Sequence, residues 1–154
     1  MPTAPSLEYE FTMSVTLAES LTVGAGAYGV RVVAPAVRGS VVGTRLNGEI
    51  TGPGADWLLI GNDGYGRVDV RLQIATDDGA LVYLTYDGIL QLTDAAVAAA
   101  GTPGVESGWD DQYFRTSPRF ETGAPQYTWL QQSMFVARGR LSLDGVQYEV
   151  FRVA

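Results

Sequence analysis

The 154-residue chain contains no cysteine and no histidine, and all ten of its basic residues are arginine, so that lysine is absent too. These absences exclude a disulfide, a cysteine nucleophile, a Ser-His-Asp relay, a Schiff-base amine and a Cys/His zinc site. Any proton transfer must therefore depend on Asp, Glu or Tyr, and negative charge must be stabilised by arginine and backbone amides.

Long apolar runs and a basic surplus are also missing. No run approaches the ~20 apolar residues that cross a bilayer. A net charge of −7 argues against nucleic acid as a partner. The acidic pairs 77–78 and 110–111 have neither EF-hand spacing nor a nearby histidine, so we expect no metal and no other cofactor. Residues 1–5 lack the regions typical of a secretion signal, and we expect a cytoplasmic protein with a single domain over residues 1–154.

Short segments of alternating polarity, divided by 19 glycines and seven prolines, predict an all-β protein. The expected strands are 7–16, 28–33 (ended by Pro35), 41–50, 57–60, 68–76, 81–86, a brief one at 113–116, 138–143 and 146–153. Asp78-Gly79 and Asp144-Gly145 predict two tight hairpins. One short helix is expected at 95–100, capped by Thr93 or Asp94. Because so many strands have poorly guarded edges, a closed antiparallel barrel is favoured over an open sandwich.

The segment 101–126 is long, and its part 113–123 combines arginines, aromatics and an acid. Tyr113, Arg115, Phe120 and Glu121 suit either a lid over a ligand or a subunit contact. Residues 127–130 follow, and an extended conformation would place Tyr127 and Trp129 on one face, where they could hold an organic ligand or pack in the core.

The hairpin at 68–86 carries the strongest candidate site. A two-residue turn places Arg71 opposite Tyr86, so that Asp69, Arg71 and Tyr86 share one face. Inside the barrel these side chains would supply a base, an anion clamp and an acid, whereas on the outer wall Asp69 would simply pair with Arg71 in solvent. The turn 52–57 lacks the lysine and the following helix of a nucleotide loop, and we expect it to direct Asp56 and Trp57 to the barrel mouth.

An ordered set of motifs then carries a resemblance. The segments are 52–57 (GPGADW), 69–71 (DVR), 76–80 (TDDGA), 113–116 (YFRT), 120–123 (FETG) and 127–130 (YTWL). The chain resembles a bacterial and fungal family, the domain of unknown function number three-two-three-seven, except that Gln131 stands where that family usually has Asn. The resemblance implies a small calycin-like barrel, similar to lipocalins and often a homo-oligomer. It also implies relatives that are cofactor-free enzymes acting on unsaturated carbonyl compounds, among them Michael-type hydratases.

We therefore expect a cofactor-independent lyase of the hydratase type, which adds water to an α,β-unsaturated carbonyl compound inside the barrel. Its base would be Asp69 first, then Asp56 or Glu121. The remaining roles fall to an arginine that stabilises the enolate, a tyrosine that moves the α-proton, and aromatics that pack the ligand: Arg71 with Arg45 or Arg115 as substitutes, Tyr86 or Tyr127, and Trp57 with Trp129. The alternatives are a lipocalin-like carrier of a small apolar or phenolic ligand, and an interaction protein whose Arg115- and Phe120-containing loop builds a homo-oligomer.

Overall fold

The computed structural model describes all 154 residues and contains nine strands, one α-helix and one 3₁₀ helix. In chain order the elements are β1 (Leu7–Leu17), β2 (Leu21–Gly26), β3 (Gly29–Gly43), β4 (Gly48–Ile60), β5 (Tyr65–Thr76), β6 (Leu81–Gln91), α1 (Asp94–Gly101), β7 (Phe114–Glu121), η1 (Pro125–Gln131), β8 (Phe135–Ser142) and β9 (Gly145–Val153). No helix has the length and apolarity needed to cross a bilayer.

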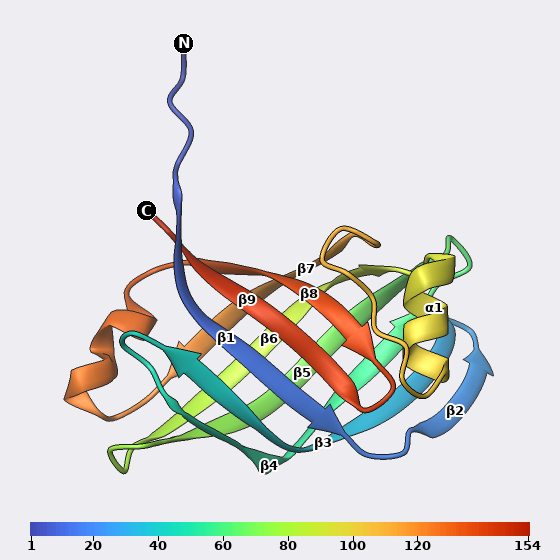
Figure 1. The fold of residues 1–154 in the computed structure, drawn as a ribbon, viewed down its shortest axis with the longest axis horizontal. Coiled ribbons are helices and arrows are strands. Elements are labelled where there is room, and N and C mark those ends of the chain that lie inside the picture. Colours follow the sequence, from blue (N-terminus) through green and yellow to red (C-terminus); the bar gives the residue numbers. More distant parts are fainter.

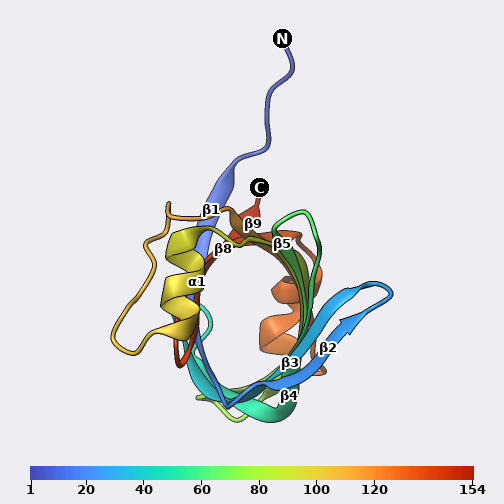
Figure 2. The ribbon, with the colours of Figure 1, turned by 90° about the vertical axis from the view of Figure 1, so that its right-hand side faces the viewer.

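The strands form a closed antiparallel barrel, as the sequence predicted (Figure 1). Their order is β1-β9-β8-β7-β6-β5-β4-β3-β2, and β1 also pairs with β3. That additional pairing closes eight strands into a ring and leaves β2 outside it as an extra strand on β3. The ring is seen end-on in Figure 2, where the hairpin of β2 and β3 projects from the wall.

Apolar side chains fill the barrel interior. Every second residue of β5 is buried, and the same alternation continues in β1, β6, β7 and β8. The largest fully buried side chains come from all around the ring and include Tyr148, Phe11, Phe114, Phe135, Met13, Leu72, Ile74 and Leu84. The interior is therefore a packed core over most of its length, as expected for a barrel of about eight strands.

Truncation of this core is expected to destabilise the protein strongly. Leu72 lies in β5 with none of its surface exposed. Leu72→Ala should lower the free energy of unfolding by about 2–5 kcal/mol, because a closed ring of strands collapses poorly around a new cavity. Arg71 precedes Leu72 and points outward, so Arg71→Ala is the control. This substitution should change the free energy of unfolding by less than about 1 kcal/mol. Urea unfolding of both variants measures the difference, and equal losses would contradict a packed interior.

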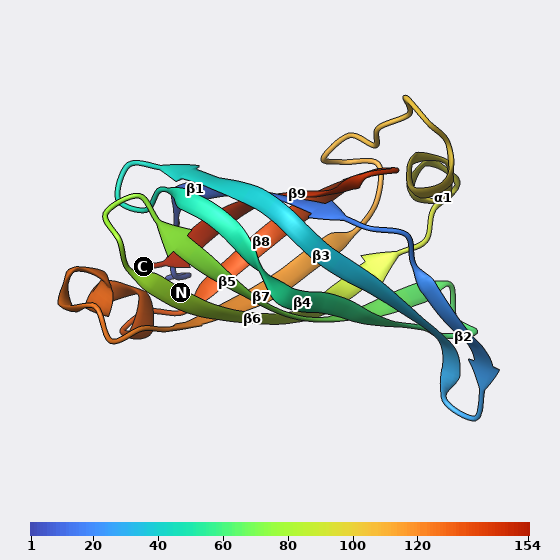
Figure 3. The ribbon, with the colours of Figure 1, turned by 90° about the horizontal axis from the view of Figure 1, so that it is seen from below.

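The two barrel ends differ. One end is covered by η1 and the turn 77–80, and we call it the η1 end (Figures 1 and 3). At the other end β2 and β3 project beyond the ring, and we call it the arm end. Helix α1 packs beside β8 near the arm end, and Thr93 caps it by accepting a hydrogen bond from the Ala96 amide, as predicted.

Several predicted boundaries are wrong. β3 continues through Pro35 to Gly43, and β4 runs unbroken from Gly48 to Ile60 with only a bulge where a turn was expected. β7 is longer than the predicted 113–116, and β2 was not predicted. Residues 127–130 form part of the 3₁₀ helix η1 and not an extended segment, because Pro125 favours the first turn of a helix.

Candidate functional site

Three polar side chains face the barrel interior near the arm end. They are Asp56 from β4, Tyr86 from β6 and Tyr148 from β9. Asp56 and Tyr86 lie on either side of Val70 in one row across three neighbouring strands, because Asp56 pairs with Val70 and Val70 pairs with Tyr86. The ring of Tyr148 reaches Tyr86 from another part of the wall, and the two rings pack edge to face with their centroids 5.1 Å apart.

A bulge in β4 lies just before Asp56. The β4–β5 pairing shifts register between Thr51 and Ala55, where Pro53 has no amide hydrogen to donate. After the shift Asp56 lies opposite the inward-facing residues Ala34 and Val70. Its Oδ1 accepts a hydrogen bond of 3.0 Å from the Asp69 amide. Trp57 consequently points outward and is 38% exposed.

A small cavity separates Asp56 from the two tyrosines. Its volume is about 240 Å³ including the part that opens to solvent, and its enclosed part has room for about one water molecule. The rest of its lining is apolar: Val15, Leu17, Ala36, Val70 and Val146. A carboxylate, two phenol hydroxyls and space for one water therefore meet in an otherwise apolar environment.

The surroundings of Asp56 make its carboxyl group a weak acid. Burial raises the pKa of Asp56 to about 7, and the negative charge of Asp69 adds to the increase. The hydrogen bond from the Asp69 amide and the positive charge of Arg31 act in the opposite direction. No arginine forms an ion pair with Asp56, whereas the other buried carboxylate, Glu10, is paired with Arg45 and Arg152. Asp56 can therefore exchange a proton near neutral pH.

Both tyrosines remain protonated hydrogen-bond donors. Burial raises the pKa of Tyr86 and of Tyr148 above that of a free phenol, and the charge of Asp56 contributes to both shifts. Tyr148 was missed in the sequence. The signal was available, because Tyr148 and Val150 alternate along the inner face of β9, and Tyr148 lies opposite Gly139, which leaves room for large rings.

The predicted grouping of Asp69, Arg71 and Tyr86 is wrong. The observed pairing places Arg71 opposite Thr85 and Asp69 opposite Asp87, one residue away from the predicted register. Asp69 and Arg71 are consequently exposed on the outer wall, while Tyr86 is buried inside. The mechanism that depended on Asp69 and Arg71 inside the barrel therefore has no site.

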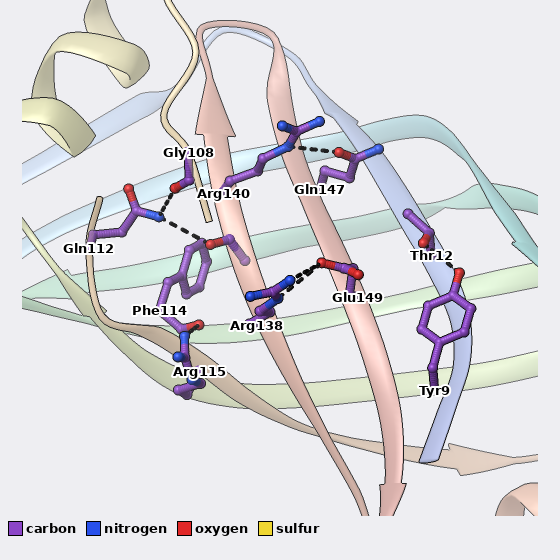
Figure 4. A network of polar contacts seen from close by, with 11 residues as sticks. Tyr9, Thr12, Gly108, Gln112, Phe114, Arg115, Arg138, Arg140, Gln147 and Glu149 are labelled. Carbon is purple, nitrogen blue, oxygen red and sulfur yellow. Dashed lines mark hydrogen bonds and ion pairs between the residues drawn. The ribbon is translucent and has the colours of Figure 1, made fainter. Parts of the chain in front are cut away.

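The predicted site residues of segment 113–123 do not gather inside the barrel: Tyr113 and Arg115 line one open depression of the outer wall, and Glu121 lines another with Asp69 and Arg71. Glu121, Arg115 and Tyr113 are exposed on the outer wall, and Phe120 is buried in the core. Arg115 donates to the Phe114 carbonyl at 3.0 Å (Figure 4). The loop before β7 lies along β8, where the buried Gln112 donates to the carbonyl oxygens of Gly108 and Gly139 (Figure 4). This loop completes the wall where β7 pairs with β8 at only two positions, and it does not cover a ligand.

The remaining predicted residues lie at the η1 end. Arg45 stacks on the Trp129 ring, with its guanidinium carbon 3.6 Å from the centroid, and it donates two hydrogen bonds to Glu10. The Tyr127 hydroxyl donates to Asp78 Oδ1 at 2.8 Å. These contacts attach η1 to the barrel, so Arg45, Tyr127 and Trp129 lie apart from Asp56 and close the opposite end. No three Asp or Glu side chains gather in a way that would hold a metal ion.

Comparison with known families agrees with this architecture. Residues 5–153 match the family described as protein of unknown function (DUF3237), which covers nearly the whole chain. The chain is a member of the DUF3237 family. The resemblance carried by the sequence motifs is thereby confirmed.

Relatives of this DUF3237 protein include a UPF0311 protein of Rhodopseudomonas palustris, 33% identical over 97% of the chain and 98% of the relative. The crystal structure of a conserved protein of unknown function from the same organism has a TM-score of 0.89 at 32% identity, with both chains fully covered. A β-barrel-like protein from Acinetobacter baumannii has a TM-score of 0.85 at 29% identity and covers 100% of this chain and 99% of its own.

A more distant structure shows the same fold. It is described as an enzyme from Penicillium herquei and has a TM-score of 0.74 at 20% identity, covering 100% of the DUF3237 chain and 98% of its own.

Gln131 forms two hydrogen bonds to the backbone of Thr122: its side-chain oxygen accepts from the Thr122 amide at 3.4 Å, and its side-chain nitrogen donates to the Thr122 carbonyl at 3.1 Å. In this member the position therefore links η1 to the end of β7.

Proposed function

We propose that this DUF3237 protein is a cofactor-independent hydro-lyase that adds water to a small α,β-unsaturated carbonyl compound, with Asp56 as the general base. One observation carries the proposal: Asp56 is a carboxylate that faces the barrel interior without an arginine partner, and burial raises its pKa to about 7. A base with that pKa is well matched to proton transfer near neutral pH. The description of the distant fungal relative as an enzyme is compatible with catalysis on this fold.

The chemistry follows from the three side chains. Asp56 accepts a proton from the water in the cavity as the water oxygen bonds to the β-carbon of the substrate. The electrons of the carbon–carbon double bond move to the carbonyl oxygen, and Tyr86 and Tyr148 donate hydrogen bonds to the resulting enolate. The enolate then collapses, and the proton held by Asp56 or one from solvent is transferred to the α-carbon. The net change is the addition of one water, and the reverse sequence is a dehydration.

The size of the cavity limits the substrate. Its enclosed part has room for about one water molecule, so the substrate must be small and must enter through the part of the cavity that opens to solvent. Leu17 and Val146, which line the cavity, favour an apolar substrate. The same filled interior disfavours the lipocalin-like carrier, because such a carrier needs a cavity that encloses its ligand.

A turnover assay tests the proposal. The protein is incubated with small cyclic enones and butenolides in isotopically labelled water, and the β-hydroxy carbonyl product is measured by mass spectrometry. We expect labelled product from the wild type, and Tyr86→Phe or Tyr148→Phe should lower kcat/KM by about 100-fold. Tyr83→Phe is the matched control, because Tyr83 lies on the outer side of β6, and it should retain full activity. An inactive wild type, or unchanged turnover in both inner variants, would refute the proposal.

A further inference from the structure

The hairpin of β2 and β3 projects past the barrel at the arm end. Strand β1 pairs with β9 only as far as Thr16, which lies opposite Gly145, and the chain then continues as β2 along the outer half of β3. We call β2 together with residues 29–35 of β3 and 55–60 of β4 the arm (Figures 2 and 3). Nothing in the molecule covers the free side of β2.

The arm is apolar on both of its faces. On the outer face Leu21, Val33 and Trp57 lie directly opposite one another across the three strands. Leu21 is 63% exposed and Trp57 is 38% exposed. The other face carries two partly buried apolar pairs, Val32 with Leu58 and Val30 with Ile60. The charged residues of the arm are Arg31 and Asp56 alone. A sheet with this pattern is typical of a buried element.

Strand β2 is also the one terminal edge of the sheet. Each of the other eight strands has a neighbour on both sides, because the β1–β3 pairing closes the ring. Natural edge strands are usually protected by charged residues or proline, and β2 (LTVGAG) contains neither. Its outward backbone amides and carbonyls are therefore available for pairing with another strand.

We infer that the arm binds the arm of a second copy of this chain, with the two β2 strands pairing in antiparallel orientation about a two-fold axis. A second copy fits because it presents an edge that is equally apolar and equally unpaired. The apolar outer face of the arm then continues across β2 into the same face of the second copy. Because each chain has one terminal edge, the pairing closes at a dimer and does not extend into a fibre. The net charge of −7 on each chain opposes association through the remaining surface.

Sedimentation analysis of the purified protein tests this interface, independently of any activity. The wild type is expected to be a dimer at micromolar concentration. Leu21→Glu places a carboxylate of each chain in the apolar outer face of the interface and should weaken dimerisation by at least 100-fold. Leu81→Glu is the matched control, since Leu81 is 60% exposed and lies at the η1 end, and it should remain dimeric. A monomeric wild type, or a dimer that tolerates Leu21→Glu, would overturn the inference.

Cysteine cross-linking locates the contact. The chain has no cysteine, so each introduced thiol is unique. Leu21→Cys should give a covalent dimer at low protein concentration with a bifunctional thiol reagent that spans ~17 Å, the length of five residues of a strand, and Leu81→Cys should give none under the same conditions. Circular dichroism confirms that both variants are folded. Equal cross-linking at the two positions, or none at position 21, would show that the copies do not meet along β2.

Discussion

Replacement of Asp56 by Asn should reduce kcat/KM for hydration by at least about 10³-fold while leaving the fold intact, because the variant has no general base. The asparagine Oδ1 can still accept the hydrogen bond that the Asp69 amide donates to Asp56, so the β4–β5 contact is preserved.

In the wild type kcat/KM should rise with pH and level off above about 7, since Asp56 acts in its deprotonated form and its pKa is raised to about 7. Steady-state kinetics between pH 5 and 9 would measure both effects.

Asp69→Asn is the informative control for this prediction. The backbone amide of Asp69 donates a hydrogen bond to Asp56, but the side chain of Asp69 is exposed on the outer wall. Its negative charge raises the pKa of Asp56, so its removal should move the rising limb of the pH profile to lower pH without changing the plateau. Loss of activity in Asp69→Asn together with an active Asp56→Asn would contradict the assignment of the base.

The second large effect concerns stability. The pKa of Asp56 is raised to about 7 in the folded protein from an ordinary value of 3.8, so between these two values the folded state holds a proton that the unfolded chain releases. The contribution of Asp56 to the free energy of unfolding must therefore be highest below about pH 4 and fall as pH rises to about 7. A difference of about three pH units corresponds to at most roughly 4 kcal/mol, and partial solvent exposure reduces it. Asp56→Asn should remove this dependence.

Comparison of the variant with the wild type isolates that contribution. Asp63 acts in the opposite direction, because its hydrogen bonds to Arg67 lower its pKa to about 2, but it is present in both proteins and cancels in the difference. Urea unfolding at pH 5 and pH 8 should show Asp56→Asn gaining stability relative to the wild type at the higher pH. A constant difference between the two proteins at both values would mean that Asp56 titrates normally.

Much of the architecture could be predicted because it depends on local patterns. The alternation of buried and exposed residues in β5 and the Thr93 cap of α1 need only a few neighbouring residues to be recognised. Closure of the barrel could be inferred from the number of strands and their unguarded edges. The arm could not, since it depends on how far β3 extends past the end of β1, and this distance is a property of the whole ring.

The site was predicted less well, and one turn explains most of the error. Asp78-Gly79 suggested a two-residue hairpin, but Thr76 Oγ1 accepts a hydrogen bond from the Ala80 amide and donates one to Asp78. These bonds stabilise a longer turn, in which Ala75 pairs with Leu81. A slip of one residue reverses the faces of a strand. The slip places Tyr86 on the opposite face from Asp69 and Arg71, and Asp56, the second choice from the sequence, is the carboxylate on the inner face with Tyr86.

The pKa of Asp56, measured from the side-chain carboxyl carbon shift in an NMR titration with Asp56→Asn used for assignment, tests the central claim most directly. A value near 7 is expected, because the proposed base depends on burial among apolar side chains beside Tyr86 and Tyr148. A value close to 4 would mean that the carboxylate is well solvated. It would remove the physical basis for catalysis at this end of the barrel.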